Sequence, residues 1–200
     1  MKKVRWEITN NLQQGDALRE YDKCTYVCRK DDYWVTTETP LKYTQKYCLV
    51  AFMTPQNVGT EFHYSAWPLH MTLADVFAIE LDKTGIVDAL RSLLSTVHTV
   101  QVRAVEDSVL GEQKTPVTIF DRSKDLEELH VKLIDLLEAH GASFNTPEFV
   151  RDGFLPHATV QASGRVSVGD ALTIRSVSLV DMFPDGDWQR RRVLATFELA

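Results

Sequence analysis

The sequence predicts an α+β fold in which helices lie outside an antiparallel or mixed sheet. Two observations lead to this prediction. Short apolar runs rich in β-branched and aromatic residues recur along the chain, and two longer segments between them repeat apolar residues at helical spacing. Runs of paired strands with two intervening helices are typical of the α+β class.

The first 44 residues differ from the rest because they are polar and contain several turn signals. Residues 25–28 and 33–37 are β-rich runs on either side of a predicted turn at 30–32. We therefore expect residues 1–44 to be an N-terminal extension, a β-hairpin packed on a main domain of residues 45–200.

The main domain is expected to contain seven strands. Each is a short run that is apolar throughout or alternates between apolar and polar residues. The runs lie at 47–53, 69–79, 100–105, 117–120, 155–161, 172–180 and 192–199. The sequence Asp-Gly-Asp at 185–187 predicts a hairpin-type turn before the last strand.

Two helices are expected, at 83–98 and 124–140. Asp82 or Thr84 can cap the first helix, Ser123 can cap the second, and Gly141 marks the end of the second. Their apolar stripes are Ile86, Val87, Leu90, Leu93, Leu94 and Val97 in the first helix, and Leu126, Leu129, Leu133, Leu136 and Leu137 in the second.

Composition and charge limit the classes of function. The 200 residues are 44% hydrophobic and 25% charged, which is close to the globular average. A net charge of −6 argues against binding to duplex DNA, although a small pocket for one phosphate is compatible with it. Three cysteines cannot all pair, and no apolar stretch is long enough to span a bilayer. We expect a soluble, cytoplasmic protein that is a monomer and has no membrane partner.

Two His-x-Thr motifs are the chemically informative feature of the sequence. Side chains alternate across a strand, so His70 and Thr72 share one face, as do His157, Thr159 and Gln161. The opposite face is apolar in both motifs, at Leu69, Met71 and Leu73 and at Ala158 and Val160. A proline stands just upstream of each histidine, at Pro68 and Pro156. One such motif could arise by chance among six histidines, but a matched pair is a stronger signal.

Phosphodiester cleavage needs this set of groups. A base must take a proton from the attacking oxygen, and an acid must give one to the leaving oxygen. Histidine can do either near neutral pH. Threonine hydroxyls on the same face can donate hydrogen bonds to the non-bridging phosphate oxygens, where charge develops. We therefore predict catalysis by His70 and His157 and phosphate binding by Thr72 and Thr159, with no metal and no cofactor.

The segments 67–73 and 154–160 resemble the paired signature motifs of the 2H phosphoesterase superfamily. The resemblance extends over about 47–199 and is closest to the 2′-5′ RNA ligase-like branch, which includes RNA 2′,3′-cyclic phosphodiesterases. It implies a bilobal, pseudo-twofold fold with one motif per lobe and a central cleft between them. It also implies that the histidines are an acid–base pair and that the threonines hold phosphate.

The sequence departs from that family in one respect near the second motif. Many members carry a basic residue a few positions after it, whereas this chain has Val-Gln-Ala-Ser at 160–163. As a working hypothesis, His157 activates water and His70 protonates the leaving ribose oxygen.

Several other residues are site candidates. Trp67, Phe154 and Tyr64 are candidate substrate contacts, because aromatic rings, including Trp188, can stack on a base. Gln161 is a further candidate contact, because it shares a face with His157 and Thr159. The arginines at 190–192 could lie near phosphate or form a solvated turn and edge strand. Cys24, Cys28 and Cys48 with His63 could be considered as a zinc site, but the Cys-x-x-x-Cys spacing on a predicted strand is poor for zinc, and buried free thiols are favoured for the three cysteines. Solvated positions are expected for His98, His130 and His140.

The expected function is hydrolysis of a 2′,3′-cyclic phosphate or a related phosphodiester of RNA or a nucleotide. The substrate would be an RNA end or a small nucleotide. A 2′-5′ RNA ligase or esterase, a phosphoesterase of ADP-ribose metabolism and a non-catalytic nucleotide-binding module remain alternatives. Accidental motifs would predict that the two His-x-Thr strands do not face one another.

Overall fold

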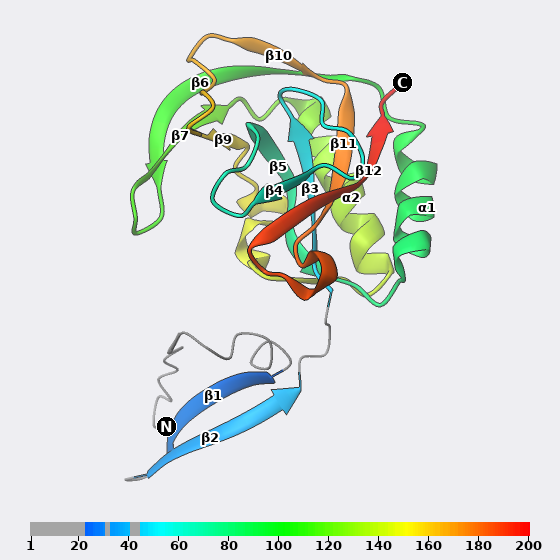
Figure 1. Ribbon diagram of the computed structural model, residues 1–200. Coiled ribbons are helices and arrows are strands. Elements are labelled where there is room, and N and C mark those ends of the chain that lie inside the picture. The colour runs from blue at the N-terminus through cyan, green and yellow to red at the C-terminus, as the bar shows by residue number, and fades with distance from the viewer. Residues whose placement is uncertain (1–22, 31–32, 41–44) are drawn as a thin grey trace. The chain divides into compact units, whose positions relative to one another are not determined.

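The computed structural model describes residues 23–30, 33–40 and 45–200, and its chain divides into two units, Met1–Thr44 and Gln45–Ala200. In the first unit, β1 (Lys23–Lys30) pairs antiparallel with β2 (Tyr33–Pro40), with Lys30 opposite Tyr33 (Figure 1). The expected packing of this segment on the main domain stays a prediction.

The second unit contains a sheet of ten strands with two α-helices (Figure 1). Every strand pair is antiparallel, and the order is β10-β6-β7-β9-β5-β3-β11-β12-β4, with β8 pairing β5 beside this path. The α+β prediction is confirmed. The strands are β3 (Tyr47–Phe52), β4 (Glu61–His63), β5 (His70–Ala78), β6 (Val100–Leu110), β7 (Thr115–Phe120), β8 (Ser143–Phe144), β9 (His157–Thr159), β10 (Ala171–Ile174), β11 (Ser176–Asp181) and β12 (Arg190–Glu198).

The two helices begin at side-chain caps that the sequence indicated. Asp82 accepts a hydrogen bond from the Gly85 amide at 2.7 Å at the start of α1 (Lys83–Leu94). Ser123 accepts one from the Leu126 amide at 3.4 Å at the start of α2 (Lys124–Ala139). The first helix ends at Leu94 rather than at the expected residue 98, because residues 95–96 form a turn. Three short 3-10 turns, η1 (Pro147–Phe149), η2 (Arg151–Gly153) and η3 (Pro184–Gly186), complete the elements.

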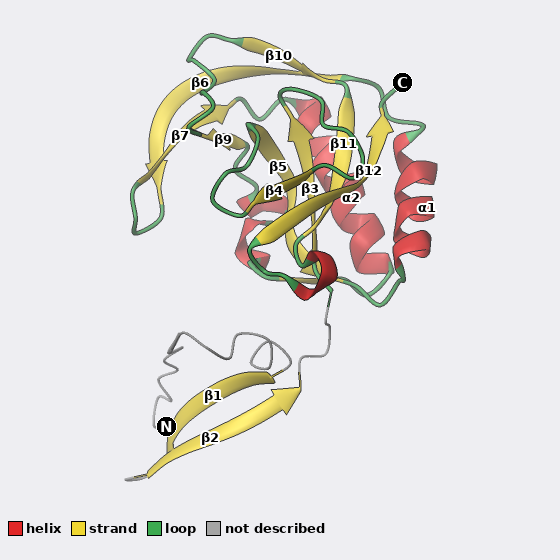
Figure 2. Ribbon diagram, in the orientation of Figure 1, coloured by secondary structure: helices red, strands yellow, loops and turns green. Residues whose placement is uncertain are grey.

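Both helices pack on one face of the sheet (Figure 2). Alternation along β3 shows how the sequence builds this arrangement. Tyr47, Leu49 and Ala51 belong to the large core that includes the helix residues, whereas Cys48 and Val50 belong to a smaller apolar cluster on the opposite face. The sheet therefore has one face closed by helices and one face that carries a second, smaller set of apolar residues.

The run predicted as a single strand at 172–180 is in fact two strands. Arg175 separates β10, which pairs with β6, from β11, which pairs with β3 and β12. Two consecutive strands with no turn signal between them look like one strand in the sequence. The short strand β4 was also missed; it pairs with β12 and forms that edge of the sheet. No helix in the described part of the chain is long and apolar enough to cross a membrane.

Candidate active site

The two motif strands are neighbours in the middle of the sheet. β5 pairs antiparallel with β9, and Met71 lies opposite Ala158. The flanking positions of this ladder place His70 beside Thr159 and Thr72 beside His157. The two motifs are thus related by a local twofold axis through the Met71–Ala158 pair.

All four motif side chains lie on the sheet face away from the helices. Met71 and Ala158 point into the large core, so the residues on either side of them must point the opposite way. His70, Thr72, His157 and Thr159 are all partly exposed. The possibility that the two strands face away from one another is therefore excluded.

The two histidines are held in the same way. His70 Nδ1 lies 2.7 Å from the Pro68 carbonyl oxygen, and His157 Nδ1 lies 2.8 Å from the Leu155 carbonyl oxygen. A carbonyl can only accept, so Nδ1 must carry the proton in both rings. Each imidazole consequently presents Nε2 as its free nitrogen. The residue two positions before each histidine fixes both the ring and its tautomer.

The surroundings of His70 are aromatic. Its ring centroid lies 4.6 Å from that of Trp67 and 6.0 Å from that of Phe52. Burial among these groups lowers the pKa of His70 below its ordinary value, against an opposing effect of the Pro68 carbonyl. A smaller lowering comes from the charge of His157, so the two imidazoles interact electrostatically. His70 is therefore biased towards its neutral form.

Chemically, the arrangement offers a proton acceptor, a proton donor and two hydroxyl donors on one small area of sheet. The neutral Nε2 of one histidine can accept a proton while the other histidine, when protonated, donates one. Thr72 and Thr159 can donate to phosphate oxygens between the two rings. Among the residues with described side chains, no group of three or more His, Cys, Asp or Glu could hold a metal ion.

The candidate substrate contacts fall into two groups. Trp67 packs against His70, and Tyr64 is 41% exposed and lies 5.1 Å from Trp188 between ring centroids. Gln161 is partly exposed just beyond β9, where its backbone N–H donates to the Gly164 carbonyl. These three residues stay candidates for contacts with substrate.

Phe154 does not belong with them. It is 5% exposed and stacks on His130, with ring centroids 4.0 Å apart and an interplanar angle of 4°. A ring that is already stacked and buried in the core has no free face for a base. Nearness to the motif in sequence was misleading, because the side chain turns towards α2.

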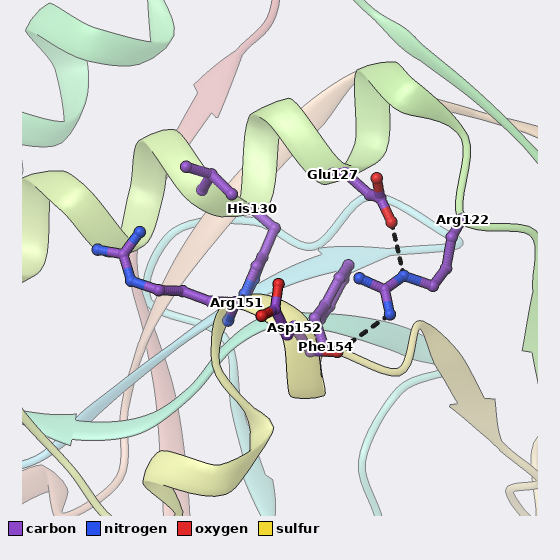
Figure 3. A pocket seen from close by; sticks show the side chains of 7 residues that line it. Arg122, Glu127, His130, Arg151, Asp152 and Phe154 are labelled. Atoms are coloured by element: carbon purple, nitrogen blue, oxygen red, sulfur yellow. Dashed lines mark hydrogen bonds and ion pairs between the residues drawn. The ribbon is translucent and has the colours of Figure 1, made fainter.

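The position of His130 also differs from the expectation. It was expected to be solvated, but it is 2% exposed, and both of its ring nitrogens have partners. The signal was present in the sequence, because position 130 falls on the apolar stripe of the helix between Leu126 and Leu133. His130 lines a pocket of about 210 Å³, together with Arg122 and Arg151 (Figure 3).

The arginines at 190–192 have partners within the protein. Arg190 pairs with Glu61, Asp185 and Asp187, and Arg192 pairs with Glu61 and Asp185. Arg191 donates to the Met182 and Trp188 carbonyls at 2.9 and 2.6 Å. These contacts support the structural interpretation of the run over a role in phosphate binding.

Cys48 is a buried free thiol, and Sγ donates to the Ala74 carbonyl at 3.4 Å. Burial raises its pKa well above the usual thiol value, so it stays protonated and unreactive. The side chains of Cys24 and Cys28 lie outside the described residues. His63, the fourth residue considered for a zinc site, instead lies 2.7 Å from the Ser65 hydroxyl.

Comparison with known proteins gives a family match. The family model described as the 2′-5′ RNA ligase superfamily matches residues 55–176, which include both motifs. No curated protein sequence matches the chain.

Solved structures similar to this chain include two of E. coli LigT and one from Thermus thermophilus. LigT complexed with 3′-AMP is 14% identical, with 78% of this chain and 98% of that chain covered and a TM-score of 0.48. LigT complexed with NADP+ is 15% identical, with 80% and 99% covered and a TM-score of 0.49. The T. thermophilus protein TT0787 is 16% identical, with 77% and 97% covered and a TM-score of 0.47.

Proposed function

This chain belongs to the 2′-5′ RNA ligase superfamily, and we propose that it is a metal-independent phosphoesterase that hydrolyses a 2′,3′-cyclic phosphate or a related phosphodiester of RNA or a nucleotide. The observation that supports this most strongly is the antiparallel pairing of Met71 with Ala158, which sets two identically held histidines diagonally across one face of neighbouring strands. Two imidazoles and two threonine hydroxyls on one face suit a single phosphate group.

The two histidines divide the work. A base must be neutral when water attacks, and the aromatic surroundings of His70 favour its neutral form. We assign His70 as the base that activates water and His157, on the shorter strand, as the acid that protonates the leaving ribose oxygen. This reverses the working hypothesis from the sequence, and the burial of His70 is the reason.

Charge favours a small substrate or an RNA end over a long duplex. The net charge is −6, and the one run of three arginines is engaged by carboxylates and carbonyls of the protein. Binding along a duplex needs many cations directed at phosphates. Trp67 packs against His70, and we assign it as a contact for a group next to the phosphate.

The family name also includes ligation, which is the second candidate activity. Formation of a 2′-5′ linkage from a 2′,3′-cyclic phosphate is related to hydrolysis by replacing water with a ribose hydroxyl as the nucleophile. The same base and acid serve both reactions, so supplying an RNA 5′-hydroxyl end in the assay separates the two.

The test is hydrolysis of the four nucleoside 2′,3′-cyclic phosphates in the presence of EDTA by wild-type, His70→Ala and His157→Ala proteins. We expect turnover that survives chelation and falls by about 10²–10⁴-fold in either variant. His98→Ala and His140→Ala, which alter two exposed histidines, are the matched controls and should retain activity. Full activity in His70→Ala or His157→Ala, or loss of wild-type activity with EDTA, would contradict the proposal.

A further inference from the structure

His130 connects α2 to both halves of the site through its two ring nitrogens. Nδ1 donates to the Leu73 carbonyl at 2.7 Å, and Nε2 accepts from the backbone amide of Arg151 at 2.8 Å. One ring thus joins the residue that follows Thr72 to the turn that leads to His157. Only the neutral ring with its proton on Nδ1 can make both bonds.

The partner on β5 lies at a β-bulge. Along the β3–β5 ladder, Val50 pairs with Thr72 and Leu49 pairs with Ala74, so Leu73 is an extra residue. On the other edge of β5, the described pairing with β9 is at Met71, and pairing with β8 begins again at Phe77. Leu73 falls between these two pairings along β5, and His130 supplies a donor to its carbonyl.

The partner on the other side belongs to a tight turn. Arg151 has φ of 57°, a conformation that is uncommon for a residue with a side chain. A side-chain carbon at Gly153 would lie 1.8 Å from the Glu148 carbonyl oxygen, so the turn requires glycine there. An unusual backbone conformation of this kind persists only where surrounding contacts stabilise it. The hydrogen bond from the Arg151 backbone amide to His130 is one such contact.

The turn runs directly into the second motif. Phe154 follows it and stacks on the His130 ring, and the next residue, Leu155, provides the carbonyl that holds His157 Nδ1. His130 therefore contacts the chain immediately before the group that fixes the His157 ring. The same imidazole bonds the chain one residue after Thr72.

From this geometry we propose that His130 is a positioning residue for the two motifs: it braces Leu73 and the 151–154 turn so that Thr72 and His157 keep their relative places on neighbouring strands. This inference rests on the proposed function for its catalytic consequence. His130 does not touch the reacting atoms, because both of its nitrogens are occupied and its side chain lies on the helix side of the sheet. Small displacements of catalytic groups are costly to turnover, which gives such a brace its effect.

Charged groups around the ring are consistent with a neutral brace. Arg122 and Arg151 lie on either side of it, and Glu127 and Asp152 line the same pocket (Figure 3). Arg122 is engaged by Glu127 at 2.6 Å and by the Asp152 carbonyl at 3.1 Å. Burial lowers the pKa of His130, and both arginines add to that lowering against the opposing Leu73 carbonyl.

Three substitutions separate the contacts of the ring. His130→Asn places an amide N–H near the Nδ1 position and loses the acceptor for Arg151. His130→Gln places an amide oxygen near the Nε2 position and loses the donor to Leu73. His130→Phe keeps a ring against Phe154 and loses both bonds. His140→Phe, an exposed histidine at the end of the same helix, is the matched control.

Two readouts are measured well below each variant's melting temperature. The first is kcat and KM for the cyclic nucleotide, where we expect kcat to fall by about 10–10²-fold in His130→Phe with KM changed by no more than about twofold. The second is the NMR signal of the His157 imidazole. This signal should move in His130→Phe and His130→Asn, move less in His130→Gln and stay in place in His140→Phe.

A lowered melting temperature with unchanged kcat and an unmoved His157 signal in all three variants would show a merely structural role and overturn the inference. If wild-type protein does not hydrolyse the cyclic nucleotides, the proposed function fails, but the NMR readout still decides on positioning. Should His130→Phe not fold, the Asn and Gln variants decide the question, because each keeps one of the two bonds.

Discussion

β5 and β9 carry the same motif in unlike surroundings. β5 has nine residues and pairs with β3 over most of its length, whereas β9 has three residues. The two histidines are held alike by a carbonyl two residues upstream, but His70 packs against Trp67 and Phe52. The motif fixes the tautomer and direction of each ring, and the aromatic surroundings of His70 favour its neutral form.

The difference shows how one short motif used twice can serve two opposite tasks. General acid–base catalysis needs one neutral and one protonated group at the same pH. In a structure in which both motifs had identical surroundings, either histidine could take either role. Among the described residues, the aromatic ring contacts of Trp67 and Phe52 are with His70 and not with His157, which removes that symmetry.

The largest effect is expected for combined removal of the histidines. If His70 and His157 act as a unit, the double Ala variant should be no more than a fewfold slower than the worse single variant, each being about 10²–10⁴-fold below wild type. Steady-state kcat/KM for the preferred cyclic nucleotide measures this. Losses that multiply would show that the two residues act independently.

Loss of either threonine hydroxyl should have a smaller and similar effect, because the local twofold axis places the two alike. Thr72→Val and Thr159→Val keep the side-chain shape and remove one donor to phosphate, so we expect a fall of about 10²-fold in kcat. Thr84→Val, at an exposed position in α1, is the control. A large loss of kcat in only one of Thr72→Val and Thr159→Val would show that the twofold symmetry of function extends to the histidines but not to the threonines.

The pH profile of kcat/KM should shift when the burial of the His70 ring is reduced. Its lowered pKa predicts that kcat/KM stays high as pH falls below the ordinary histidine range, because the base is still neutral there. Trp67→Gln reduces the burial of the ring and should move the acid limb to higher pH. Phe149→Gln, at a residue that is 55% exposed, should leave the limb in place.

The smallest effect concerns stability. Because the folded-state pKa of His70 is lowered, its neutral ring contributes stability that is complete above the unfolded histidine pKa of about 6.5 and is lost as pH falls towards the folded value. His70→Phe should therefore lose less free energy of unfolding than wild type between about pH 7.5 and pH 5. Part of the pH dependence of stability remains in His70→Phe, because the pKa of buried His130 is lowered as well. Denaturant titrations at each pH measure the free energy of unfolding, with His98→Phe, at an exposed histidine, as the control. An equal pH dependence of this free energy in wild type and His70→Phe would contradict the prediction.

Much of the fold could be predicted because its signals are local. Apolar spacing and the side chains of Asp82 and Ser123 located both helices, and alternation around His70 and His157 located the motif strands and their outward faces. The bulge at Leu73 could not be predicted, because it depends on the register with β3.

The remaining misses have the same cause. Arg175 divides two strands that pair with different neighbours, which only the tertiary fold decides. Phe154 and His130 meet from distant segments, so the sequence could show that position 130 lies on an apolar stripe but not what it contacts. Side-chain direction in a loop such as 150–156 follows from packing rather than from periodicity.

The division of labour between His70 and His157 is tested most directly by changing the leaving group. A 4-nitrophenyl ester of a nucleoside monophosphate releases a phenolate that needs no proton, whereas the ribose oxygen of a 2′,3′-cyclic phosphate needs one. We predict that His157→Ala loses about 10² or more in kcat/KM on the cyclic phosphate but stays close to wild type on the nitrophenyl ester, while His70→Ala is impaired on both. The opposite pattern, with His70→Ala rescued by the nitrophenyl ester and His157→Ala not, would contradict the assignment and return the base to the second motif.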